Sequence, residues 1–75
     1  MEFEEAALAI LRDESRPLHW TVILDLALRR GYLDPFTQPD PRSHLLKALG
    51  RAAREGTIDK RGSGVYALPA PHASG

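Results

Sequence analysis

The side chains of this 75-residue chain whose types could do chemistry are basic, and they gather between Arg42 and Arg61. Residues 41–61 carry six cations against two carboxylates, a net charge of +4, whereas residues 1–14 carry −4. Cations at this density can neutralise the phosphates of an anionic polymer. The formal net charge of zero for the whole chain hides this separation. The charge distribution therefore predicts contact with double-stranded DNA through this segment.

Most of these cations belong to a predicted helix over residues 41–55. Asp40 can cap its start, Pro41 suits the first helical position, and Gly56 ends it. At about 100° per residue, one side of this helix is apolar and the other polar. The apolar side comprises Leu45, Leu46, Ala48, Leu49, Ala52 and Ala53. The opposite side supplies the candidate DNA contacts Ser43, His44, Lys47, Arg51 and Arg54, and Arg42 at the start of the helix is a further candidate.

The helix is followed by a predicted hairpin, residues 57–61 and 65–68, around Gly62-Ser63-Gly64. Lys60 and Arg61 stand next to this turn, and its small residues would let the backbone approach phosphates closely. Lys60, Arg61 and Ser63 are therefore further candidate DNA contacts. In both segments the alternative is an ordinary solvated surface whose cations serve solubility.

The rest of the chain supplies the elements that would position this helix and hairpin. Residues 3–13 have helical periodicity, a short strand is expected near Leu18, and Thr21 can cap a helix that runs to about Arg30 before Gly31. This order predicts a mainly α fold with a small antiparallel sheet, a winged helix-turn-helix of three helices and a β-hairpin wing. It would occupy residues 1–68, with residues 69–75 as a disordered tail.

Other classes of function find little support. The chain has no cysteine, no apolar stretch long enough for a bilayer and an acidic start unlike a signal peptide, so a cytoplasmic protein with no membrane contact is expected. His19, His44 and His72 lack a metal-ligand spacing, and His19 is expected to make a local hydrogen bond instead. No nucleophile–base arrangement or phosphate-binding glycine loop is present, so we expect neither a cofactor nor catalysis.

Several short pieces resemble one family. They are Ala6-Ala7, Ile10-Leu11, Pro17-Leu18-His19, Ile23, Ala27, Gly31, Pro41 with Leu45, and Gly62-Ser63-Gly64-Val65-Tyr66-Ala67-Leu68. Together they resemble the HARE-type winged helix-turn-helix domain over residues 3–68. That family includes the N-terminal domain of the bacterial RNA polymerase delta subunit and modules fused to restriction endonucleases and chromatin proteins. The resemblance implies DNA-linked work, although His44 replaces a small Thr-like residue and Asp40 a Thr cap.

The second predicted helix offers a different kind of surface. Val22 and Leu26 lie one turn apart on the side that carries Asp25 and Arg29. An exposed apolar pair among charges is typical of a protein contact such as a homodimer. The alternative is that the pair widens the buried stripe. Two hypotheses follow: a DNA-binding protein in transcription regulation or DNA-linked processes, or an interaction module docking on RNA polymerase or a restriction or repair assembly.

Overall fold

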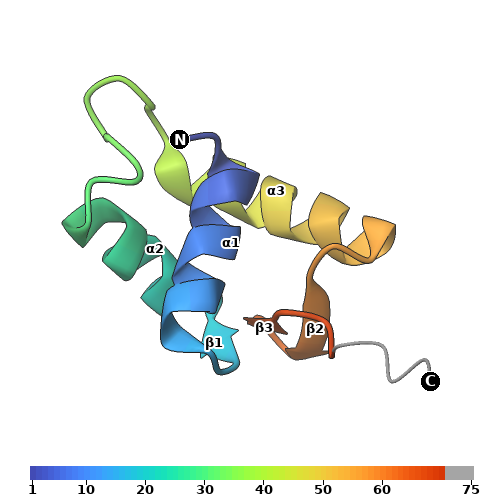
Figure 1. Cartoon of the computed structure of the whole chain (residues 1–75). Helices are drawn as coiled ribbons and strands as arrows, with labels where there is room; N and C mark the ends of the chain where they lie inside the picture. The colour runs from blue at the N-terminus through green and yellow to red at the C-terminus, as the bar shows by residue number, and fades with distance from the viewer. Residues whose placement is uncertain (71–75) are drawn as a thin grey trace.

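The chain folds into three helices and a three-stranded antiparallel sheet, and these elements follow one another in the order that the sequence predicts (Figure 1). The computed structural model describes residues 1–70, so the expected tail at 69–75 lies mostly outside the described residues. The elements are α1 (Phe3–Glu14), β1 (Leu18–His19), α2 (Trp20–Arg29), α3 (Pro41–Glu55), β2 (Asp59–Gly62) and β3 (Val65–Ala67). This is a winged helix-turn-helix arrangement with a β-hairpin wing. No helix within residues 1–70 is both long enough and apolar enough to cross a membrane.

The core lies where the three helices meet, with α1 packed against both α2 and α3. Small residues such as Ala6, Ala27 and Ala52 are fully buried and let the helix backbones approach closely, while leucine and isoleucine fill the space between them. The helical residues with at most 1% of their surface exposed are Ala6, Ala7, Ile10, Leu11, Ile23, Ala27, Leu45, Leu49 and Ala52. These residues hold α3 by its apolar side and leave its opposite side to solvent.

The sheet closes the core from one side, in the order β1-β3-β2. Tyr66 lies in the central strand, opposite Leu18 on one side and Lys60 on the other, and is 6% exposed. The predicted hairpin is confirmed, with its strands shortened to Asp59–Gly62 and Val65–Ala67 and an irregular register between Lys60 and Gly62.

Gly64 fastens the hairpin to the start of α2. Its carbonyl accepts a 2.8 Å hydrogen bond from the Trp20 N–H, and its backbone is left-handed, with φ 73°. A Cβ at this position would lie 2.9 Å from His19 Nε2 and 3.1 Å from Trp20 Cδ1. Only glycine fits here without strain, because both the left-handed backbone and the close approach exclude a side chain.

The helix ends partly match the sequence prediction. Gly31 and Gly56 have φ of 74° and 81°, as expected for residues that follow a helix, and the Thr57 N–H donates to the Ala52 carbonyl at 2.9 Å. The predicted Thr21 cap is wrong: the N-cap of α2 is His19, whose Nδ1 accepts the Thr21 N–H at 3.3 Å. The expected local role of His19 is thereby confirmed. Asp40 precedes α3 as predicted, but its carboxylate makes no capping hydrogen bond within the described residues.

Candidate nucleic-acid interface

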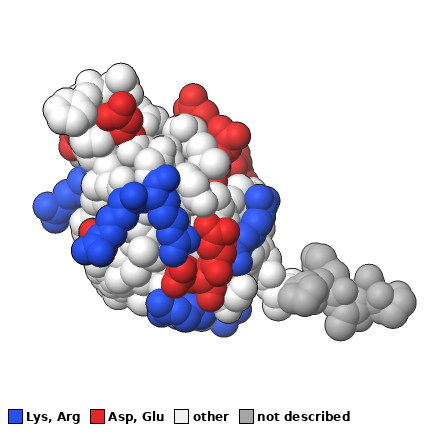
Figure 2. Space-filling view, turned by 60° about the vertical axis from the view of Figure 1, so that its left-hand side comes forward, with Lys and Arg blue, Asp and Glu red and all other residues white. Residues whose placement is uncertain are grey.

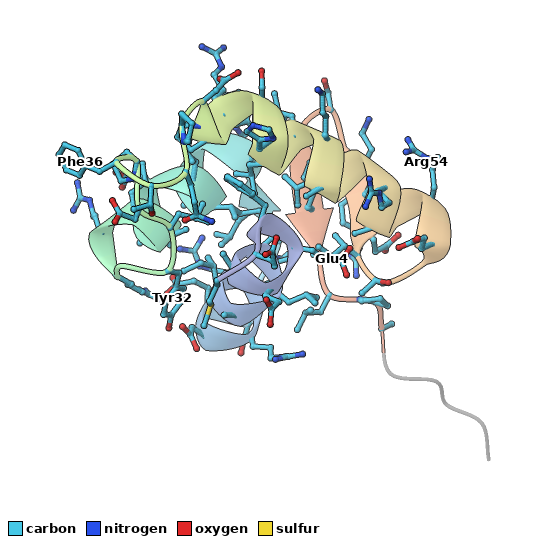
Figure 3. All side chains as sticks on the ribbon, turned by 90° about the horizontal axis from the view of Figure 1, so that it is seen from above. Glu4, Tyr32, Phe36 and Arg54 are labelled. Carbon is cyan, nitrogen blue, oxygen red and sulfur yellow. The ribbon has the colours of Figure 1, made fainter. Side chains whose placement is uncertain are left out.

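The outward side of α3 is a narrow stripe of alternating small and basic residues. Ser43, Lys47, Gly50 and Arg54 follow one another at helical spacing on the side opposite the buried Leu45 and Leu49. Figure 3 shows Arg54 near the C-terminal end of this helix, pointing away from the rest of the molecule. Ser43, Lys47 and Arg54 are exposed and Gly50 is half-buried. This is a shape that can approach a groove wall closely and neutralise charge there.

Ion pairing distinguishes the cations of α3 from those elsewhere. Four of the ten cations are paired with carboxylates: Arg16, Arg29, Arg30 and Arg61. Within residues 1–70 the remaining six form no ion pair, and five of these lie in α3 and β2: Arg42, Lys47, Arg51, Arg54 and Lys60. The positive charge that is left without a carboxylate partner is therefore concentrated on the helix and the hairpin.

Arg30 is an example of a cation whose charge is used in ion pairs within the chain. Its guanidinium bridges the ends of α1 and α2, with contacts of 3.0 Å to Asp13 and 2.7 Å to Glu14. The hydrogen bond from Arg30 lowers the pKa of Glu14, and the same bond raises the pKa of Arg30. The Tyr32 hydroxyl also donates to Asp13 at 2.9 Å, which raises the pKa of that phenol. These charges hold two helices together, and the paired carboxylates offset the attraction of Arg30 for a polyanion.

The side of the molecule that carries α2 has both signs of charge. Figure 2 shows acidic and basic side chains next to one another on this face. Asp25 and Arg29 of α2, for example, form an ion pair of 3.0 Å within the helix. A mixed surface of this kind gives little net attraction to phosphates. Five of the six cations without a carboxylate partner within residues 1–70 lie on α3 and β2, and none of the six lies on α2.

Arg42 and the hairpin are connected through Trp20. The Arg42 guanidinium carbon lies 5.2 Å from the centre of the Trp20 ring, within range of a cation–π contact. Trp20 packs partly against the core, and its backbone N–H donates to the Gly64 carbonyl of the hairpin. This contact places the beginning of α3 and the tip of the wing on the same flank of the molecule.

The opposite flank of α3 faces the acidic beginning of α1. The His44 ring stacks on Phe3 with 5.3 Å between ring centres. A shallow groove there is lined by Glu2, Phe3, Glu4, His44, Lys47, Ala48 and Arg51. His44 and Arg51 thus lie at the edge of the outward side rather than at its centre, and the nearby carboxylates would repel phosphates on this flank.

The position of Leu46 differs from the one that the helical periodicity predicted. It was expected on the buried side of α3, but it is 36% exposed and borders the outward stripe near Ser43 and Gly50. Its position about 100° from Leu45 already placed it at the margin of the apolar side. Leu46 and Gly50 are the two members of this face that the sequence reasoning left out of the contact set.

The hairpin offers fewer unpaired side chains for a contact than the sequence predicted. Lys60 and Ser63 are exposed, as a contact role requires. Arg61 instead forms a 2.7 Å ion pair with Asp59 and lines a groove with the C-terminal end of α1. Of the residues predicted to contact DNA, Arg61 therefore lies apart, because its side chain is turned toward α1. The other predicted contact residues lie on or beside the outer surface of α3 and the wing.

The two residues of α2 that were predicted to form a protein contact, Val22 and Leu26, differ in exposure. Val22 is 38% exposed, whereas Leu26 is half-buried and packs against the core, which agrees with the alternative that this side of α2 widens the buried stripe. Val22 alone offers too little apolar surface for a stable interface.

The chain was compared with protein-family models, with curated protein sequences and with solved structures. No family model matches it. No curated protein and no solved structure matches it either.

Proposed function

We propose that this protein is a small DNA-binding winged-helix domain that acts in transcription regulation or other DNA-linked processes. In this proposal α3 enters the major groove and the hairpin lies on the phosphate backbone. The observation that carries it is the set of five cations on α3 and β2 that have no carboxylate partner within residues 1–70. The resemblance to HARE-type domains agrees with this role, and membership of that family is part of the proposal.

The outer surface of α3 suits a groove in shape as well as charge. Ser43 and Gly50 are small, so the helix can approach the bases, and Lys47 and Arg54 on the same stripe can reach phosphates or guanine edges. Leu46 adds an apolar side chain of the kind that contacts a thymine methyl group. Arg42, beside Trp20, can bind the backbone where the helix begins.

The experiment that tests the proposal is a salt titration of binding to a fluorescently labelled duplex of random sequence. If all five cations meet phosphates, the logarithm of the affinity falls against the logarithm of salt with a slope of about −4.5, at about −0.9 per neutralised phosphate. Fewer contacts give a proportionally smaller slope. Absence of saturable binding at low salt overturns the proposal and favours the interaction module instead.

The interaction module has one structural observation in its favour. Glu2 and Glu4 line the groove beside Lys47 and Arg51, so part of α3 faces carboxylates that repel DNA. A protein partner with basic residues, in RNA polymerase or a restriction or repair assembly, could use this acidic flank. We rank it second because it leaves the cations at the centre of α3 without a role.

Gly50 gives a prediction that separates DNA contact from folding. A glycine inside a helix costs about 1 kcal/mol relative to alanine, and a Cβ here meets only Arg54 Nη1, at an ordinary 3.6 Å. We expect Gly50→Ala to raise the free energy of unfolding by roughly 0.5–1 kcal/mol and to weaken duplex binding, because the added methyl keeps the helix from the groove wall. Urea denaturation and anisotropy on the same preparation measure the two effects.

Side chains of increasing size at position 50 provide a matched series of variants. Gly50→Leu keeps good helix propensity but adds a larger side chain to the outward stripe. Binding should weaken further from alanine to leucine, while stability stays at or above that of the wild type. Equal affinity for DNA across the three proteins contradicts an approach of DNA to this side of α3.

A further inference from the structure

Phe36 is the most exposed large apolar side chain among the described residues, with 95% of its surface accessible. It lies in the loop between α2 and α3, and Figure 3 shows it projecting from the end of the molecule opposite Arg54. It makes no contact with the core cluster. Folding gains nothing from an aromatic ring in this position, so its surface is available to something outside the chain.

The loop that carries Phe36 is fixed by its own hydrogen bonds. The Asp34 N–H donates to Gln38 Oε1 at 2.9 Å, and the Gln38 N–H donates to the Asp34 carbonyl at 2.7 Å. The Phe36 N–H donates to Asp34 Oδ1 at 2.9 Å, and the Gln38 side-chain amide donates to the Met1 carbonyl at 2.8 Å. These bonds fix the backbone that carries the ring, so only the side-chain rotamer remains to be ordered on binding, which favours its use as an anchor.

The charges around Phe36 restrict what it can bind. Residues 31–41 contain Asp34 and Asp40 and no lysine or arginine. Phosphates are repelled by such a loop, so Phe36 is a poor candidate for insertion into DNA. An apolar pocket with cations at its rim is the complementary surface.

The same chain has a groove of this description at its other end. Its lining is mostly apolar, from the end of α1 and the residues after β3, and has two arginines: Leu11, Ser15, Arg16, Pro17, Arg61, Ala67, Leu68, Pro69 and Ala70. Its volume is about 450 Å³. That leaves ample room for an aromatic ring, since a cavity of about 150 Å³ holds benzene. Figure 1 shows the α2–α3 loop at one end of the molecule and the end of α1 with the sheet at the other.

We propose that Phe36 of one copy of this chain inserts into this groove of a second copy. The ring would pack on Pro17 and Leu68, with a guanidinium of Arg16 or Arg61 over its face and Asp34 near the same cations. Both arginines are partly exposed and already bound to Glu14 and Asp59, but a guanidinium has donors left for a second carboxylate. The contact does not use the outer surface of α3.

Head-to-tail geometry gives this contact a specific signature. The loop and the groove are different surfaces, so each copy can donate one ring and accept one, either from the same partner in a two-fold pair or from successive partners in an open chain. A single ring and its surroundings bury less than a standard interface, so the association is weak. Copies bound side by side on one duplex would gain from it, because the second contact becomes intramolecular.

The experiment uses two complementary variants, each altered only at exposed side chains. Phe36→Ser removes the ring, and Arg16→Glu with Ala70→Glu places carboxylates in the groove of the other variant. Circular dichroism confirms that both remain folded. We expect the wild type to self-associate in sedimentation at roughly 0.1–1 mM, the range for an interface this small, and each variant alone to be monomeric.

The mixture of the two variants decides the geometry. The groove of the Phe36→Ser protein and the ring of the other are both intact, so a 1:1 mixture forms a dimer that cannot grow further. A wild type that remains monomeric up to 1 mM overturns the proposal, as does a groove variant that associates as the wild type does. A mixture that stays monomeric while the wild type associates shows that Phe36 does not bind this groove.

Discussion

Replacing Tyr66 by alanine is expected to lower the free energy of unfolding by about 3–5 kcal/mol, the usual cost of truncating a buried aromatic side chain. Tyr66 lies in the central strand between Leu18 and Lys60 and is 6% exposed. Its ring fills the space between the sheet and the helices, and its loss leaves a cavity that short strands cannot close. In a domain of this size the loss approaches the whole stability, so the variant should be largely unfolded at moderate temperature.

The controls for this prediction are a conservative change at Tyr66 and a truncation of the exposed Phe36. Tyr66→Phe keeps the ring and should stay within about 1 kcal/mol of the wild type, the scale of one hydrogen bond. Phe36→Ala removes a ring that is 95% exposed and should change stability by less than about 0.5 kcal/mol. Urea denaturation followed by circular dichroism measures all three proteins. A Tyr66→Ala protein with an unchanged midpoint contradicts the packing of the sheet on the helices.

The elements that the sequence predicted well are those with local signals. Pro41 and Gly56 act on their own segments, so the bounds of α3 follow from residues inside or next to it. The turn at Gly62-Ser63-Gly64 likewise requires only neighbouring residues. The cap of α2 was missed because His19 and Thr21 both carry an acceptor at a suitable distance. Which of them caps the helix depends on where the backbone enters it, and the pairing of β1 with β3 decides that.

The composition of the candidate interface depended on contacts that the sequence does not state. The partners of Arg30 lie 16 and 17 residues away, so only the packing of α1 on α2 shows that this cation is paired. Leu46 lies at the margin of the apolar side, and its exposure depends on how far the neighbouring helices cover α3. Nothing in the sequence indicated that Phe36 would be held outward, beyond its place in a loop. The hydrogen bonds that fix this loop involve Gln38 and Met1, and Met1 lies far away in the sequence.

Replacing Lys47, Arg51 and Arg54 together by alanine is expected to weaken duplex binding by roughly ten- to hundredfold or more, since lost groove contacts cost about 1–3 kcal/mol. The three cations lie on the outward side of α3, and none has a carboxylate partner within residues 1–70. The salt slope should shrink by about 2.7 if each meets a phosphate. Stability should change little, because the side chains are exposed.

A variant with Arg12, Arg16 and Arg29 changed to alanine is the matched control. It removes the same net charge from exposed positions on α1, on α2 and in the segment between them. If DNA meets α3, the control keeps most of the affinity and most of the salt slope, losing only the weak long-range attraction that salt screens. If both triple variants lose affinity equally, binding follows net charge alone. The outward side of α3 then has no special role, and the acidic flank at Glu2 and Glu4 becomes the better guide to a partner.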